Sequence, residues 1–142
     1  MGDRVVLSSN VRKNWSETID FAVRNKPVFI ERTRDELTLI NNQTLLAVLN
    51  LIPLHVLVEK EDDGSVTMTG KEIEVVENAP TRKECLNRIV DSLIDFSGDF
   101  YDSYEFWTSD PARREQVPFV MKCLLTDRET LKGDIVCRDG KI

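Results

Sequence analysis

Residues 8–16 read Ser-Ser-Asn-Val-Arg-Lys-Asn-Trp-Ser and follow a short, mainly apolar segment at residues 4–7. Apolar residues then recur every four positions, at Val11, Trp15, Ile19 and Val23. This spacing predicts a single helix over residues 9–25 that buries one apolar face. Arg12 and Lys13 would lie in the first turns of that helix, where backbone N–H groups attract anions. The stretch therefore favours a phosphate-binding surface, although a solvated first turn would present the same two cations.

The composition is that of a globular protein. The chain has 142 residues, of which 41% are hydrophobic, enough for one domain or two small ones. No apolar run approaches the ~20 residues that cross a bilayer, and no signal-peptide pattern is found, so we expect no membrane contact. Cys85, Cys123 and Cys137 lack the spacing of zinc ligands and predict free thiols in a reducing cytoplasm.

The net charge of −6 is unevenly distributed along the chain. Residues 1–46 contain seven Lys and Arg against six Asp and Glu, whereas residues 47–142 contain twelve against nineteen. A nearly neutral first part with clustered cations, followed by an acidic remainder, suggests two partners of opposite charge.

The first unit is expected to contain a strand at 4–7, a helix at 9–25, strands at 27–33 and 36–41, and a helix at 42–52. Ser9 can cap the first helix, and Pro27 ends it because proline cannot continue a helix. Arg34 and Asp35 form a polar turn between two apolar segments, as in a β-hairpin. The last helix is apolar almost all round, which fits either a core or a dimer interface.

The second unit is expected to contain strands at 54–60, 66–69 and 72–77, then a long helix and further helices. Asp63 and Gly64 lie between two alternating segments and favour a hairpin. Thr81 and Glu84 form a capping box at the start of the long helix, whose apolar residues then follow the helical period.

No pattern of catalytic residues is present. The lone histidine, His55, lies in an apolar segment without a nearby nucleophile or carboxylate in a recognisable motif, and a structural role is the simpler interpretation. The chain also lacks a glycine-rich phosphate loop and a dinucleotide fingerprint. We therefore expect no enzyme activity, no catalytic residue, no metal and no cofactor.

Acidic and aromatic residues gather in the long helix and just after it. Four aspartates, at spacings of four, four and three, would share one helix face: Asp91, Asp95, Asp99 and Asp102. An acidic surface is a simpler interpretation than a metal site, because no accompanying Glu-x-x-His or EF-hand pattern occurs. Tyr101, Tyr104 and Trp107 add a composition typical of protein-binding surfaces, although core packing would explain aromatic residues equally well.

Several of these segments carry a family likeness. The strand at 4–7, the stretch at 8–16 and Pro27-Val28-Phe29-Ile30 with Arg32 resemble the N-terminal part of the Phd/YefM antitoxins. Trp15 stands where that family usually has leucine, and Arg34-Asp35-Glu36 stands where its turn usually has glycine.

The Phd/YefM resemblance implies a homodimer that binds operator DNA through its first part and a cognate toxin through its second. Matched by position, Ser9, Arg12 and Lys13 on the first helix and Arg32 on the hairpin would contact DNA. Arg34 is added to this set because of its charge and its place in the turn.

The second unit bears a weaker likeness, on the hairpin at 58–64 and the helix start at Thr81 and Glu84, to the core of the HicB antitoxins. Both likenesses imply the same role. The toxin-binding residues would be the acidic and aromatic set described above: Asp91, Asp95, Asp99, Tyr101, Asp102, Tyr104 and Trp107.

We therefore predict an α+β fold, with a β-α-β-β-α unit at residues 1–53 and a β-β-β-α unit with C-terminal helices at 54–142. The predicted function is that of a cytoplasmic type II antitoxin, which neutralises a small, basic toxin and represses its own operator. The alternative is an acidic protein-interaction or regulatory module that does not bind DNA.

Overall fold

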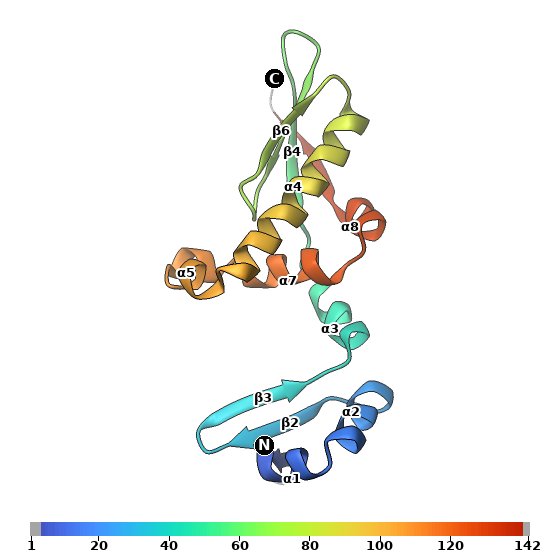
Figure 1. The fold of residues 1–142 in the computed structure, drawn as a ribbon. Coiled ribbons are helices and arrows are strands. Elements are labelled where there is room, and N and C mark those ends of the chain that lie inside the picture. Colours follow the sequence, from blue (N-terminus) through green and yellow to red (C-terminus); the bar gives the residue numbers. More distant parts are fainter. Residues whose placement is uncertain (1–3, 141–142) are drawn as a thin grey trace. The chain divides into compact units, whose positions relative to one another are not determined.

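A computed structural model describes residues 4–140 of the chain (Figure 1). The chain divides into two compact units, residues 1–47 and 48–142. Both units combine helices with a β-sheet, so the predicted mixed α+β class is confirmed. Across residues 4–140, no helix is both long enough and apolar enough to cross a membrane.

The first unit contains a three-stranded sheet and short helices. Its elements are β1 (Val5–Leu7), α1 (Ser8–Lys13), α2 (Trp15–Arg24), β2 (Val28–Arg32), β3 (Asp35–Leu39) and the start of α3 (Asn42–Leu49). The strand order is β1-β2-β3, with β1 parallel and β3 antiparallel to β2. The parallel pairing requires a crossover connection, which α1 and α2 supply.

The prediction of one helix over 9–25 is wrong, because the chain leaves the helical conformation at Asn14, with φ −122° and ψ 45°. The side-chain amide of Asn14 donates to the carbonyl of Asn10 at 3.1 Å, and such local bonds compete with helix continuation. The expected Ser9 cap is also wrong. The helix begins one residue earlier, and Leu7 at the N-cap position supplies no side-chain cap.

The expected buried face of the first helix is only half formed. Val11 is buried, but Trp15 is 56% exposed and Val23 is 53% exposed. A spacing of four residues overshoots one helical turn by about 40° each time, and the break at Asn14 separates the two helices further. The buried core of this unit is small and consists of Val11, Ala22, Val28 and Ile30.

The β2–β3 hairpin turns at Thr33 and Arg34, between the paired residues Arg32 and Asp35. Thr33 has a φ of 54°. A β-branched residue is strained in this left-handed region, where glycine is not. The turn therefore holds a threonine in a backbone conformation that glycine adopts without strain.

Substitution of Thr33→Gly should therefore stabilise the hairpin. Removal of the Cβ atom relieves the strain, whereas the greater backbone entropy of glycine in the unfolded chain opposes folding. The net gain in the free energy of unfolding is roughly 0.5–1 kcal/mol. Amide hydrogen exchange in β2 and β3 should slow about two- to fivefold. Arg34→Gly is the matched control, because Arg34 does not have a positive φ, and it should speed exchange. Equal acceleration in both variants would contradict the strain at Thr33.

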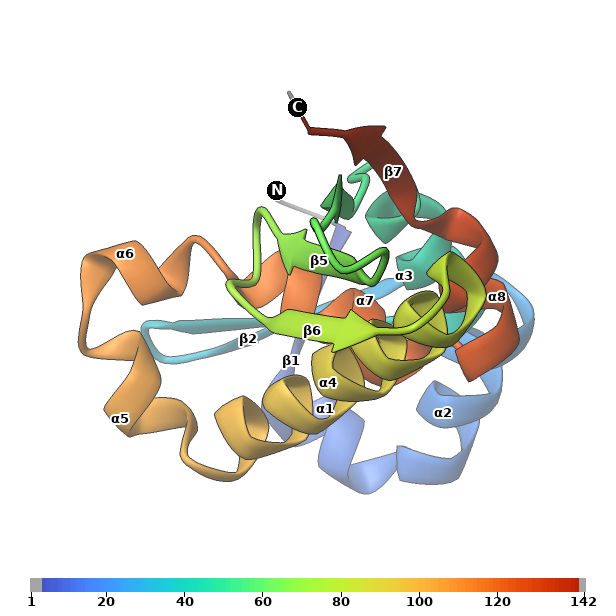
Figure 2. The same cartoon turned by 90° about the horizontal axis from the view of Figure 1, so that it is seen from above.

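The second unit contains a four-stranded sheet, and its helices α4 to α8 lie in the chain between the third and the last of these strands (Figures 1 and 2). Its elements are β4 (His55–Lys60), β5 (Val66–Gly70), β6 (Val76–Ala79), α4 (Arg82–Asp102), α5 (Tyr104–Thr108), α6 (Pro111–Arg114), α7 (Val117–Leu125), α8 (Arg128–Asp134) and β7 (Val136–Asp139). The strand order is β6-β5-β4-β7, and β7 runs parallel to β4.

The third strand of this unit lies later than predicted, at Val76–Ala79 instead of 72–77. The preceding residues form a tight loop, in which the N–H of Gly70 donates to the carbonyl of Val75 at 2.8 Å. Ile73 in this loop is fully buried. The acidic and apolar residues that alternate over 72–77 therefore belong largely to a loop, and one of them, Ile73, has its side chain in the core.

The long helix α4 organises the second unit. The hydroxyl oxygen of Thr81 accepts from the N–H of Glu84 at 3.2 Å, so the predicted Thr81 cap is confirmed. One side of α4 is buried against the sheet and against α7 and α8, through Cys85, Ile89, Val90, Leu93 and Phe100. The apolar period seen in the sequence therefore faces the core.

Thiol reactivity should report this packing. Burial raises the pKa of Cys123 to about 11 and also raises the pKa of Cys85, whereas Cys137 on β7 is less buried. At pH 8 we expect Cys137 to react first with a thiol reagent. Cys123 should react about 100-fold more slowly than in the urea-unfolded chain, from its thiolate fraction alone. Similar rates for Cys123 in the native and unfolded chain would contradict the packing.

Candidate partner-binding surfaces

The two cations of the first helix lie at its end. Arg12 and Lys13 occupy the last turn of α1 and are exposed, and neither forms an ion pair within residues 4–140. The expected position near a helix N-terminus is therefore wrong, because α1 ends at Lys13. The helix dipole favours cations at a C-terminus, so their presence needs no anionic partner, while their exposure leaves them available to one.

The other candidate DNA contacts differ in whether they form an ion pair within the protein. Ser9 and Arg34 are exposed. Arg32 forms an ion pair with Asp35 across the hairpin turn, with 2.7 Å between Nη2 and Oδ2. This pair is exposed and therefore weak, so Arg32 could exchange its partner at little cost.

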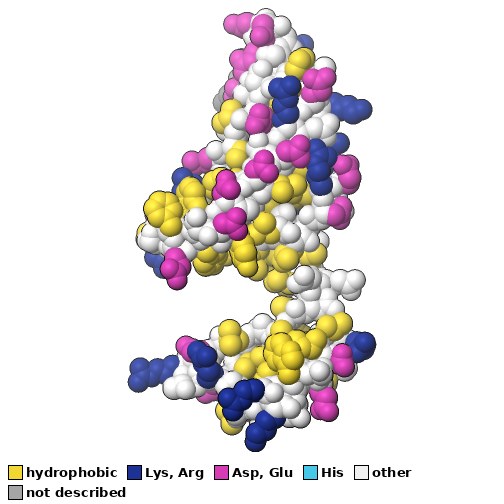
Figure 3. Space-filling view, viewed as in Figure 1, with side chains coloured by type: hydrophobic (Ala, Val, Ile, Leu, Met, Phe, Trp, Pro, Cys, Tyr) yellow, Lys and Arg dark blue, Asp and Glu magenta, His cyan; other side chains and the backbone are white. Residues whose placement is uncertain are grey.

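The first unit exposes much apolar surface. Its large exposed side chains are Leu7, Trp15, Phe21, Val23 and Leu37. An open groove of about 750 Å³ is lined by Val6, Phe21, Val28 and Phe29, with Arg4 and Lys26 among the polar residues beside them. On the face of the first unit drawn in Figure 3, hydrophobic side chains gather with Lys and Arg side chains around them. Exposed apolar patches are typical of interaction sites, so this surface is a candidate for one.

The acidic residues of α4 lie on its exposed side. Asp91, Asp95, Asp99 and Asp102 are all exposed, opposite the buried face of the helix. Acidic side chains are visible along α4 in Figure 3. The predicted shared face is therefore present, and 21 helical residues carry it.

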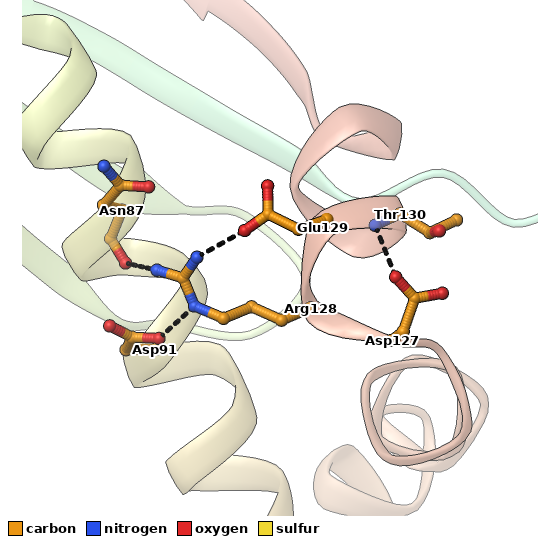
Figure 4. A network of polar contacts seen from close by, with 6 residues as sticks. All are labelled: Asn87, Asp91, Asp127, Arg128, Glu129 and Thr130. Carbon is orange, nitrogen blue, oxygen red and sulfur yellow. Dashed lines mark hydrogen bonds and ion pairs between the residues drawn. The ribbon is translucent and has the colours of Figure 1, made fainter.

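Only the first of these aspartates is paired in the described part of the chain. The guanidinium of Arg128 donates through Nε to Asp91 at 2.7 Å, through Nη1 to Glu129 at 3.0 Å and through Nη2 to the carbonyl of Asn87 at 3.2 Å (Figure 4). Arg128 holds the pKa of Asp91 below its usual value. Asp127 caps α8, accepting from the N–H of Thr130 at 3.0 Å, and so fixes the start of the helix that carries Arg128.

An aromatic cluster follows the acidic face. The rings of Phe100 and Trp107 stack with 5.8 Å between centroids, and Phe96 lies at 5.7 Å from Trp107. Tyr104 meets Phe100 edge-on, and Phe106 meets Trp107 edge-on. Trp107 is therefore half-buried within the cluster, whereas Tyr101, Tyr104 and Phe106 are exposed. The sequence-based set omitted Phe106, because composition does not show which aromatic residue faces solvent.

His55 is held by a residue that the sequence analysis did not single out. Its Nδ1 lies 3.0 Å from Oε1 of Glu72, and the same oxygen accepts from the backbone N–H of His55 at 2.6 Å. Both side chains are largely buried. The pair ties the start of β4 to the loop before β6, which is a structural arrangement. Across the described residues, no group of three or more metal-ligating side chains is found.

Comparison with known proteins identifies the family to which this chain belongs. Residues 2–136 match the PHD-like family, described as an antitoxin of toxin–antitoxin systems, RelE/RelB. The chain belongs to this family. A crystal structure from Syntrophomonas wolfei subsp. wolfei, described as an antitoxin part of a proposed toxin/antitoxin system, has a similar fold. It is 25% identical, with a TM-score of 0.90 over 96% of this chain and 99% of that one. None of the curated proteins matches the sequence.

Membership of the PHD-like antitoxin family gives the protein a toxin as partner and a regulatory role. The predicted antitoxin function is confirmed at this level. The finer likenesses to the Phd/YefM and HicB antitoxins stay predictions from the sequence.

In this PHD-like antitoxin, the pairing of Arg128 with Asp91 makes a contribution to stability that depends on pH. A lowered carboxyl pKa contributes stability above the usual value of 3.8 and loses it as the pH falls through the folded pKa. Arg128→Gln should raise the pKa of Asp91 toward its usual value, measured by NMR titration of the Asp91 carboxyl carbon. Arg114→Gln, another exposed arginine, is the control and should leave Asp91 unchanged. An unchanged Asp91 titration in Arg128→Gln would contradict the pairing.

Proposed function

We propose that this PHD-like antitoxin binds operator DNA as a homodimer through its first unit and masks a small, basic toxin with its acidic second unit. The observation that carries the proposal is the separation of surface chemistry between the two units. Exposed cations and apolar side chains characterise the first unit, whereas exposed carboxylates beside aromatic rings characterise the second.

The proposed DNA contacts are Ser9, Arg12 and Lys13 on α1, with Arg32 and Arg34 on the β2–β3 hairpin. The arginine and lysine side chains would bind phosphates, which supply most of the affinity and make it dependent on salt. Autorepression follows when the bound operator controls the antitoxin's own gene.

The exposed apolar side chains of the first unit support a homodimer. A unit of 47 residues can bury only a small core. A second copy placed on Leu7, Trp15, Phe21 and Val23 would remove these side chains from water. It would also present two α1 clusters to two operator half-sites, as symmetric DNA-binding proteins do.

The proposed toxin-binding surface lies on α4 and α5 and comprises Asp91, Asp95, Asp99, Tyr101, Asp102, Tyr104 and Trp107. A toxin that acts on RNA needs cations for the RNA phosphates, and these carboxylates would compete for the same cations. The aromatic residues would supply apolar contact area within a polar surface.

The DNA-binding part of the proposal is tested with the double variant Arg12→Ala, Lys13→Ala. Anisotropy titrations with the DNA that precedes the protein's own gene should show weaker binding. The slope of log K against log salt should become less negative by roughly 3.6, because each of the two copies in the dimer loses two phosphate contacts. Arg24→Ala is a suitable control, because Arg24 is exposed on α2, pairs with Asp20 and lies outside the proposed set.

An unchanged affinity and salt slope in the Arg12→Ala, Lys13→Ala variant would remove α1 from the DNA surface. If the unaltered protein does not bind this DNA at any salt concentration tested, the second candidate function is favoured. That candidate is an acidic interaction module without DNA binding, which the net charge of −6 supports.

A further inference from the structure

We infer that Phe106 is the side chain that inserts into the toxin, into an apolar pocket with a cationic rim. This inference rests on the proposed toxin-binding function and identifies the part of that surface that would carry the affinity. Phe106 is 74% exposed and is the most exposed aromatic residue of the second unit. It lies on α5, a helix of five residues between α4 and α6.

The ring of Phe106 is anchored to the core through other aromatic rings. Phe100 is fully buried, and Trp107 stacks on it with an interplanar angle of 11°. Phe106 then meets Trp107 edge-on at 5.7 Å and 78°. Each contact has a geometry that aromatic pairs prefer. The ring is therefore presented to solvent from a packed base.

Polar contacts around α5 also restrict its motion. Arg113 lies over the ring of Trp107 at 5.2 Å and donates through Nη1 to Oε1 of Gln116 at 3.1 Å. Gln116 is buried and donates to the backbone carbonyl of Glu72 at 3.1 Å. The hydroxyl of Ser109 donates to the carbonyl of Phe106 at 2.7 Å. Because α5 is already ordered, a partner would bind Phe106 with little cost in conformational entropy.

The charges near Phe106 define the partner. Asp99, Asp102 and Glu105 are exposed and form no ion pair with any residue of 4–140. In Figure 3, hydrophobic and acidic side chains lie together in the region of α5, with Lys or Arg side chains at its edges. These carboxylates outnumber the two cations of the adjoining helix α6, Arg113 and Arg114, so a second copy of this chain would bring like charges together, which disfavours self-association here. A basic surface with an apolar pocket complements both features, and Trp107 acts as a positioning residue beneath the ring.

The inference is tested with the protein encoded by the reading frame adjacent to this gene, co-expressed and purified with the full chain. Phe106→Ala should weaken the complex by roughly 30-fold or more, as expected for a central aromatic anchor. Phe106→Leu should recover part of the loss. The thermal unfolding midpoint of Phe106→Ala should match that of the unaltered chain, since the side chain is exposed.

Val76→Ala is the matched control, because Val76 is another exposed apolar residue of the second unit, on β6. It should leave the affinity unchanged. The variant Asp99→Asn, Asp102→Asn should associate more slowly and show a weaker salt dependence.

The outcomes separate the inference from the proposed function. If the unaltered chain binds the adjacent gene's product and Phe106→Ala binds within threefold of it, the inference is overturned and the proposed function stands. If the unaltered chain does not bind that protein, both are overturned.

Discussion

The burial of one side of α4 is the constraint on which the second unit depends. This helix contacts β5, β6, α7 and α8, and its apolar residues form the centre of both clusters of the core. The helical period that places Leu93 and Phe100 inward also places Asp95, Asp99 and Asp102 outward. The acidic surface is therefore fixed by the same register that builds the core. A rotation of α4 about its axis would disrupt the packing of the core and the acidic surface together.

Buried polar groups connect this core to the segment before β4. Lys122 on α7 is only 2% exposed, and its ammonium donates to the carbonyl of Ile52 at 2.9 Å. A buried cation is costly unless it is hydrogen-bonded. Gln116 links the carbonyl of Glu72 to Arg113, which covers the aromatic base of α5. Substitutions that disturb these contacts would alter both the segment that enters β4 and the presentation of α5.

The sequence predicted α4 well because its period and its cap are local signals of the same helix. Local signals failed at Asn14, where the backbone leaves the helical conformation, and at Ile73, which lies in a loop whose sequence alternates like that of a strand. The pairing of Arg128 with Asp91 spans 37 residues and has no local signature. Exposure of Phe106 depends on how α5 packs after α4. These features follow from tertiary contacts, which a residue pattern does not encode.

The first unit differs in that its own core is incomplete. Its exposed apolar side chains leave apolar surface in contact with water. Burial of that surface would contribute roughly 25 cal/mol per Å² to the stability of the folded unit. Under the proposed homodimer, folding of this unit and self-association are linked, so its stability rises with protein concentration. Operator binding by such a unit would respond to the amount of antitoxin more steeply than binding by a stable monomer, because dimerisation precedes it.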